Sequence, residues 1–483
     1  MKWENSKNTG YLTIFLALSL TVILSLCVAL VEGARSNGAR FMTEYALDVG
    51  MNSILAEYHR ELLKQYDVFF IDTSYGTNQP SGYKTAEHLQ EYMERNFSCN
   101  DLGLWVFNQD LYGLSVQNIR LGNFAVATDE KGKVFRKQAI QYMYDKYGLS
   151  ILSEVEEWER VVKEYNLDNS DVTARREAVE AQISALDGTK IQISEKQWVT
   201  VEIDNPADQV NVQRNKGVLL LSMSETDQLS NVGFDKTKGA SERELYKGKG
   251  PIQQRAGKET LPELLLFDEY ILEKCSFYGH ELEKSHMKYQ VEYMLAGKDN
   301  DLDNLKSIAS RLLLIREAAN TAYLFSDGDK RTLVTALATA VSAAIMLPEL
   351  QILLEYSILF AWAFAESVCD MRILFGGGRV PLLKTNSTWK TDIGALFELF
   401  NGRDGGKSES GLSYEDYLRV FLKMTGTDIK TMRLIDMAEL DIRKTPGNQN
   451  FRMDACVDGM TIEANITSSH GYAFILQREC CYE

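Results

Sequence analysis

Histidine is scarce in this sequence, and the motifs of the common catalytic and metal sites are missing. The two histidines nearest to each other, His280 and His286, are six residues apart. A helix that binds one zinc ion through two histidines needs them four residues apart. The acidic run Asp299–Asp303 lacks the later glycine and glutamate of a calcium loop. The sequence contains no GxSxG motif and no phosphate-binding glycine loop. It therefore predicts no metal, no cofactor and no catalytic residue, and we expect the protein not to be an enzyme.

Positive charge and proline are also in short supply. The chain has 52 Lys and Arg against 68 Asp and Glu, a net charge of −16. Such a chain repels the phosphates of nucleic acids, and no Lys/Arg-rich run offsets this, so no nucleic-acid partner is expected. Seven prolines in 483 residues are typical of a largely regular fold with few rigid linkers. The seven cysteines form neither a CxxC pair nor a disulfide-rich pattern.

One stretch near the N-terminus contains no charge at all. It is YLTIFLALSLTVILSLCVALV, from Tyr11 to Val31. At ~1.5 Å per residue, a helix of this length spans roughly 30 Å, the thickness of the hydrocarbon core of a bilayer. The sequence therefore predicts a transmembrane helix over 11–31, in contact with membrane lipid, after a cytoplasmic tail over 1–10.

Two other interpretations of the apolar stretch fit less well. A cleaved signal peptide has a shorter apolar region and a small-x-small exit, whereas Val31-Glu32-Gly33 is a poor exit. A lipoprotein signal ending at Cys27 requires a small residue before the cysteine, and Leu26 is large. A retained anchor is favoured.

Flanking charge does not decide the orientation of the anchor. Lys2 and Lys7 precede the apolar stretch, and Arg35 and Arg40 follow it, so the counts tie under the positive-inside rule. A short N-terminal tail with a very large downstream body is compatible with export of that body. We expect a single-pass protein of the cell membrane with an extracytoplasmic body.

The residues after the anchor predict an amphipathic stalk helix over 32–65. Its apolar stripe, at three- and four-residue spacing, consists of Met51, Ile54, Leu55, Tyr58 and Leu62. Either one helix runs from Tyr11 to about residue 65 with a kink near Gly33 or Gly38, or two helices flank a short loop at 33–38.

The middle of the chain alternates between strand and helix patterns. An α+β region is predicted over 66–224, with strands at 66–72, within 104–128 and at 191–204, and with helices at 135–166 and 171–186. A turn is expected at 129–132. Residues 225–260 are poor in large apolar groups, which predicts a linker or long loop that divides the chain.

The second half predicts a mainly helical domain over 261–450, followed by C-terminal β strands over 451–483. Helices are expected at 261–277, 305–325, 331–347, 349–375, 414–424 and 429–442, and a strand or short helix at 288–297. The segments 331–347 and 349–375 are apolar enough to resemble membrane spans. Because Glu355, Glu366 and Asp370 lie in the second segment, we interpret both as buried core helices. The overall fold class is α+β.

Three charged residues in apolar surroundings predict a structural ion-pair cluster. Glu366 and Asp370 are four residues apart, so they share one face of an apolar helix. Arg316 lies in the similarly apolar LLLIREAAN. We expect these charges to pair in the core, because an unpaired buried charge is costly. Catalytic use of the two carboxylates is the alternative.

The N-terminal sequence GYLTIFLALSLTVILSL, followed by VEGAR and a long amphipathic helix, resembles that of TadE/TadG-like, pseudopilin-like proteins. In that family a prepilin-like helix anchors an exported domain of the tight-adherence (Flp) pilus and secretion apparatus. The resemblance implies a prepilin-peptidase cut between Gly10 and Tyr11. Phe15 stands at the fifth position after this cut, where pilins carry glutamate.

The second half is similar to an uncharacterised family of Gram-positive bacteria that carries the same kind of anchor and is associated with tight-adherence pilus genes. The resemblance rests on EYMLAGK (292–298), LLLIREAANTAYL (312–324), AWAFAESVCDMRIL (361–374), VPLLKT (380–385) and YEDYLRVFL (414–422). It implies no catalytic residues, because the family has no established activity.

Together these observations predict a membrane-anchored, extracytoplasmic structural or assembly component of a pilus-like surface apparatus, with other pilus or secretion-apparatus proteins as partners. The alternatives are an extracytoplasmic hydrolase acting on the cell envelope and a single-span ligand-binding protein.

Overall fold

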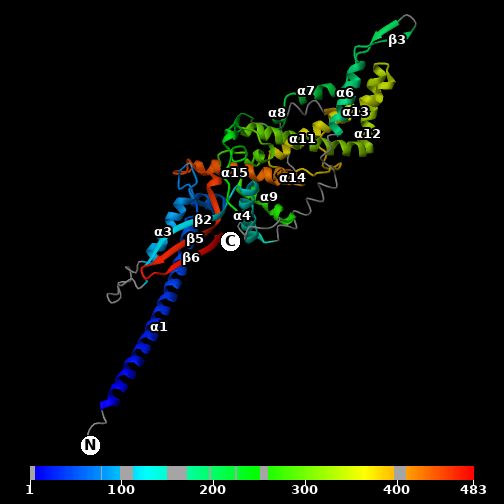
Figure 1. The fold of residues 1–483 in the computed structure, drawn as a ribbon. Coiled ribbons are helices and arrows are strands. Elements are labelled where there is room, and N and C mark those ends of the chain that lie inside the picture. The colour runs from blue at the N-terminus through cyan, green and yellow to red at the C-terminus, as the bar shows by residue number, and fades with distance from the viewer. Residues whose placement is uncertain are drawn as a thin grey trace. The chain divides into compact units, whose positions relative to one another are not determined.

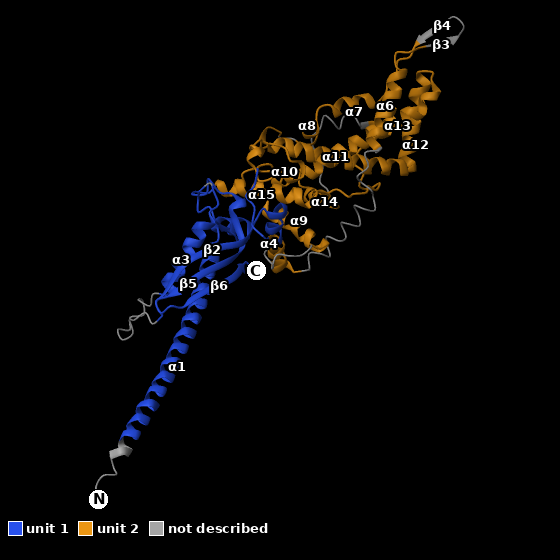
Figure 2. Cartoon of the chain, in the orientation of Figure 1, with its two compact units in different colours: residues 1–138, 244–258, 445–483 blue, residues 139–243, 259–444 orange. Residues whose placement is uncertain are grey.

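The computed structural model describes residues 6–77, 79–97, 112–148, 171–194, 197–223, 226–250, 259–395 and 410–482. The chain folds into two compact units (Figures 1 and 2). Unit 1 contains residues 1–138, 244–258 and 445–483, and unit 2 contains residues 139–243 and 259–444. Helices and an antiparallel sheet coexist, which confirms the α+β class.

Helix α1 (Ser6–Leu55) is one uninterrupted helix of 50 residues. No proline interrupts it, and Gly33 and Gly38 both lie within it. The loop considered at 33–38 is therefore absent, and the helix stops ten residues before the predicted end at 65. The chain then makes a short break, in which the backbone N–H of His59 donates to the carbonyl of Phe70 (2.8 Å). The His59 side chain caps the next helix, α2 (Arg60–Tyr66).

Unit 1 contains a four-stranded antiparallel sheet centred on β5 (Cys456–Ser468). Strand β5 pairs with β2 (Leu114–Val126), with β6 (Ala473–Cys481) and, at its first two residues, with β1 (Ile71–Asp72). The strands predicted around 113–128 are one strand with three register irregularities. The strand predicted at 66–72 shrinks to β1, because Tyr66 ends α2 and Asp67 takes a left-handed conformation (φ 51°).

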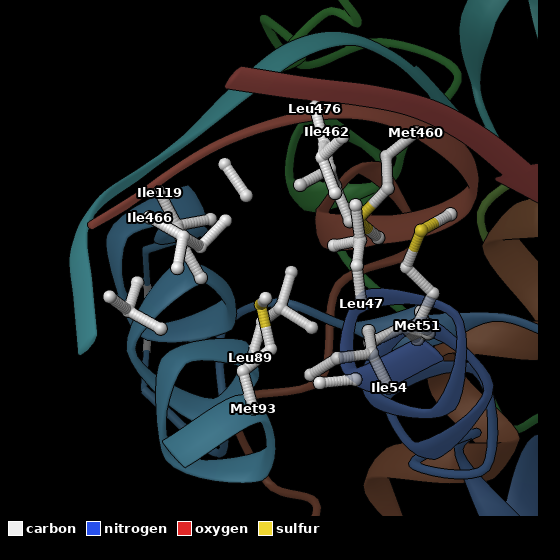
Figure 3. Close-up of a cluster of buried hydrophobic side chains, with 14 of the residues drawn as sticks. Leu47, Met51, Ile54, Leu89, Met93, Ile119, Met460, Ile462, Ile466 and Leu476 are labelled. Carbon is white, nitrogen blue, oxygen red and sulfur yellow. The ribbon is translucent and has the colours of Figure 1, made fainter. Parts of the chain in front are cut away.

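The core of unit 1 lies between this sheet and two helices, α1 and α3 (Gly82–Phe97) (Figure 3). The second half of α1 contributes Leu47, Met51 and Ile54, which are buried. They meet Leu89 and Met93 of α3, and the strands contribute Ile119, Met460, Ile462, Ile466 and Leu476. The amphipathic stripe therefore faces the sheet.

Unit 2 is mainly helical and is built around α13 (Gln351–Phe375). In the most apolar stretch of this helix, 78% of the residues are buried. Two clusters of apolar side chains surround α13. One joins it to α6 (Asp171–Leu186), α11 (Asp301–Ser326) and α12 (Gly328–Ala344), and the other to α7 (Ala207–Arg214) and α8 (Val218–Ser222). The segment 349–375 is thus a buried core helix, as its interior charges indicated. The same prediction is wrong for 331–347, because α12 buries only Val334, Ala338 and Ser342 and exposes its other side.

The remaining elements complete both units. Helix α4 (Asp129–Tyr147) begins in unit 1 and ends in unit 2, and its first turn contains left-handed residues at the predicted turn 129–132. Unit 2 also contains α9 (Leu261–Lys274), α10 (Gln290–Ala296), α14 (Tyr414–Met424), α15 (Thr427–Arg443) and the hairpin of β3 (Lys190–Ser194) and β4 (Gln197–Thr200). Short 3₁₀ turns occupy Thr226–Gln228, Lys236–Lys238, Pro348–Leu350, Ile393–Ala395 and Met453–Ala455.

Two boundaries between the units, at 243/244 and 258/259, fall within the segment 225–260, where a linker or long loop is predicted. The described part of this segment is held by polar contacts rather than free. Ser241 donates through its backbone N–H to Asp436 (3.0 Å), and Arg243 makes two bonds of 2.6 Å to Glu439. Farther along, Lys249 forms a β-bridge with Phe124 in unit 1. Most of the described residues in this segment are exposed, and the polar contacts hold it at a few points.

The strands predicted over 451–483 are β5 and β6. They belong to the sheet of unit 1, because β5 pairs with β2 from much earlier in the chain. Residues 288–297 resolve to the helix α10. The predicted strand at 104–107, the second half of the predicted helix 135–166 and most of the tail over 1–10 lie outside the described residues.

Gly50 allows α1 and α3 to approach closely, so Gly50→Val should lower the free energy of unfolding by about 1–3 kcal/mol. A Cβ at this position would lie 2.7 Å from Cδ1 of Leu89 and 3.3 Å from Cγ of Met93. Gly33→Val is the control, because nothing lies within 4 Å of a Cβ there. Denaturant unfolding of the detergent-solubilised chain measures both variants. Equal effects would contradict close packing at Gly50.

Candidate functional site

The structure brings Arg316, Glu366 and Asp370 together in the core of unit 2 and adds a fourth charge, Lys384. Arg316 lies on α11, the two carboxylates lie on α13, and Lys384 lies in the loop that follows α13. Arg316 Nη2 is 2.8 Å from Asp370 Oδ2. Lys384 Nζ is 2.6 Å from both Glu366 Oε1 and Asp370 Oδ1. Each of the four side chains is at most 1% exposed. We call these four residues the buried quartet.

Arg316 uses its guanidinium to hold three parts of unit 2. Besides Asp370, Nη1 donates to the carbonyls of Pro381 and Leu382 (3.0 Å each) and to the Tyr417 hydroxyl (3.1 Å). Nη2 lies 3.4 Å from Asn320 Oδ1, one turn along the same helix. Arg316 thereby ties α11 to α13, to the loop after α13 and to α14.

Glu366 is equally saturated with donors. Its two oxygens accept from the backbone N–H groups of Lys390 (3.0 and 3.1 Å) and Thr391 (2.9 Å) as well as from Lys384. The carboxylate therefore closes the loop 384–391 onto α13. Glu366 and Asp370 are held inside the core, which disfavours the alternative that they act on a substrate.

The buried quartet contains two positive and two negative charges, so it is neutral as a whole. Burying an ion costs several kcal/mol unless partners and hydrogen bonds offset the lost hydration. Sequence reasoning identified one cation, which would have left one carboxylate without a counter-charge. The missing partner is Lys384, which directly follows the apolar residues VPLL. A single cation after an apolar run was the signal in the sequence that could have pointed to it.

Another buried carboxylate, Glu292 on α10, has no cationic partner among the described residues. Its Oε1 accepts from the backbone N–H of Tyr278 (2.9 Å) and from the Tyr414 hydroxyl (2.8 Å), while Oε2 has no hydrogen-bond partner. Burial raises the pKa of Glu292 to about 7, and its two donors only partly counteract this. The nearby acid Asp301 raises the pKa further. The sequence offered no signal for this site.

The proposed cleavage position, Gly10–Tyr11, lies in the first turns of α1, and both residues are exposed. The apolar half of α1 that follows is exposed throughout its most apolar window, and it is long and apolar enough to cross a membrane. Its hydroxyl groups donate to carbonyls three residues earlier in the same helix: Thr13, Ser19, Thr21 and Ser25, at 2.7–3.1 Å. These internal bonds suit a helix surrounded by lipid, where no water could replace them.

Beyond the apolar half, α1 carries two aromatic rings on the side away from its buried stripe. Phe41 is 67% exposed and Tyr45 is 51% exposed, and their rings stack with centroids 6.4 Å apart. Arg40 and Glu44 form an ion pair on the same turn (3.1 Å). Exposed aromatic side chains of this kind are enriched at contact surfaces between proteins.

Comparisons with known proteins give one match. The model of a protein family described as a family of unknown function (DUF5702) matches residues 196–468. None of the curated proteins and none of the solved structures matched the chain. Within the described ranges, no group of three or more His, Cys, Asp and Glu residues is placed to hold a metal ion.

Removing Arg316 from the buried quartet should destabilise unit 2. Arg316→Ala leaves Asp370 and its surroundings with unbalanced negative charge, and we expect a loss of about 3–5 kcal/mol in the free energy of unfolding. Lys306→Ala, which removes an exposed cation from the same helix, should change it by less than about 0.5 kcal/mol. Denaturant unfolding measures both variants, and an unchanged midpoint for Arg316→Ala would refute the structural role.

Glu292 should make stability depend on pH. Its folded pKa lies above that of an unfolded glutamate, so its contribution is fully present below about pH 4 and is lost as pH rises to about 7. Glu292→Gln removes this loss. The free energy of unfolding of the variant should exceed that of the natural protein by about 2 kcal/mol at pH 8 but not at pH 4.

The matched control is Glu283→Gln, which neutralises an exposed carboxylate in the segment before α10. The free energies of unfolding of this variant and of the natural protein should change with pH in the same way between pH 4 and pH 8. If the free energy of unfolding of Glu292→Gln also follows that of the natural protein, the carboxylate titrates normally in the folded protein.

Proposed function

Because the family match covers more than half of the chain, the protein belongs to this family of unknown function, and we propose that it is a membrane-anchored structural or assembly component of a tight-adherence (Flp) pilus or type II-like secretion apparatus. In this proposal α1 anchors the chain in membrane lipid, the body is extracytoplasmic, and the contacts are with other proteins of the apparatus rather than with a substrate.

The division of α1 into two halves is the observation that carries the proposal. Residues 11–31 of the helix are apolar, exposed and free of charge, while its second half supplies Leu47, Met51 and Ile54 to the core of unit 1. The helix runs from one half to the other without a break. The core of unit 1 is thus joined to the anchor by one continuous helix. A subunit that packs against others through its membrane helix needs such a connection.

The N-terminal resemblance to TadE/TadG-like proteins supports the same function. The residues at Gly10 and Tyr11 match the position of a prepilin-peptidase cut and are exposed at the start of α1. Phe15 replaces the glutamate found in pilins. This replacement favours an accessory subunit over a major filament subunit.

An envelope-acting hydrolase is the competing function. It would need acidic or histidine side chains open to a substrate. Glu366 and Asp370 are fully buried and paired with Lys384 and Arg316. This geometry favours a scaffold role for unit 2.

The exposed rings on α1 give the proposal its test. A photo-crosslinking amino acid at Phe41 should capture a neighbouring protein in the native membrane, because Phe41 is largely exposed. The same residue at Lys306, on an exposed turn of unit 2, is the control for random collision. Mass spectrometry of the adduct identifies the partner. We expect a protein encoded with the pilus genes or a second copy of this chain.

Failure to capture any protein at position 41, with expression unchanged, would contradict the assembly role. The N-terminus of the protein isolated from its native membrane gives an independent readout. A start at Tyr11 means cleavage by a prepilin peptidase, whereas an intact Met1 means a permanent anchor and removes the processing step from the proposal.

A further inference from the structure

One end of the unit 1 sheet lies where α1 leaves its apolar segment. The Tyr472 hydroxyl, in the turn between β5 and β6, donates to the Glu32 carboxylate and lies 3.4 Å from the Glu32 carbonyl. Glu32 is the first charged residue after the charge-free stretch 11–31. The β5–β6 turn is therefore fixed beside the point at which the helix emerges.

A second contact holds the same end of the sheet against α1. A Cβ at Gly38 would lie 2.5 Å from the Tyr112 hydroxyl, so the missing side chain lets this ring approach the helix. The residues at the start of β2 bond to the turn: Ser468 donates its hydroxyl to the Tyr112 carbonyl, and Ser469 donates its N–H to Gly113 (2.8 Å). We call residues 112–113 and 468–474 the sheet tip.

The sheet tip is also free of charge. No Asp, Glu, Lys or Arg occurs from 111 to 119 or from 464 to 477, although such residues make up 25% of the chain. Tyr472 and Phe474 pack together, with ring centroids 6.4 Å apart, and the neighbouring Ile475 is 74% exposed. A charge-free surface with tyrosine and phenylalanine suits the membrane–water interface, where aromatic side chains are enriched.

The length of the apolar segment sets the depth of the tip. A helix over 11–31 fills the roughly 30 Å hydrocarbon core, and the headgroups add about 5–8 Å on each side. A side chain that touches Glu32 then lies within the headgroup layer. The tip presents hydroxyl groups and aromatic rings to this layer, and no lysine or arginine. Its lipid partner therefore does not need to be anionic.

We propose that the sheet tip is a lipid-contacting surface that sits in the headgroup layer beside α1. This inference rests on the membrane anchor of the proposed function. It gives unit 1 a second attachment to the membrane, and the bond from Tyr472 to Glu32 fixes the angle between the sheet and the emerging helix.

Photo-crosslinking to lipid tests the inference in the full chain, reconstituted into phosphatidylcholine vesicles. A benzophenone amino acid is placed at His470 in the tip, with Ala473 as a second position, since both are exposed. Leu20 reports on the anchor. Gln449 is the matched control, because it is exposed and lies next to Asn448, which bonds to His59 beyond the far end of α1.

We expect lipid adducts at Leu20 and at His470 or Ala473, at least tenfold above those at Gln449. Adducts at Leu20 without adducts at either tip position would overturn the tip contact and leave the anchor intact. Equal yields at the tip and Gln449 would also overturn it, because contact would then be unspecific. No adduct at Leu20 would refute the anchor itself, and the tip contact with it.

Discussion

The structure of unit 1 depends on one constraint: a single helix must satisfy two different environments. In its first half α1 exposes leucine, isoleucine and valine side chains and bonds its own hydroxyl groups internally. In its second half the same helix turns an apolar stripe toward the sheet and exposes the opposite side. Since no break separates the halves, any rotation of the anchor about its axis also rotates the core residues Leu47, Met51 and Ile54.

Unit 2 places charged side chains inside an apolar core. The charges of the buried quartet sum to zero, because Lys384 pairs with both carboxylates and Arg316 pairs with Asp370. Well-packed apolar residues often achieve similar stability, so the stability of the core does not by itself require this network. The network does impose a specific arrangement. Here the arrangement is the course of the loop 381–391, which no regular secondary structure would otherwise define.

Much of the fold could be predicted from local patterns. The charge-free stretch at Tyr11, the helix 349–375 and the charges within it are readable because periodicity and composition act over a few turns. Lys384 escaped because its loop owes its position to distant partners. The contacts of the segment 225–260 could not be predicted, because polar side chains such as Ser241 and Arg243 look solvated until their partners on α15 are known. The pairing of β2 with β5 joins residues more than three hundred positions apart, and nothing in either strand specifies the other.

That pairing has a consequence for the order in which the protein forms. Unit 2 lies entirely within residues 139–444, whereas the central strand of unit 1 begins at Cys456. During synthesis from the N-terminus, unit 2 has all its residues while the sheet of unit 1 still lacks its middle strand. The contacts of the α1 stripe with β5 and β6 therefore form only when the last part of the chain arrives. During this interval the core of unit 1 is unfinished, and this is when a chaperone has access to it.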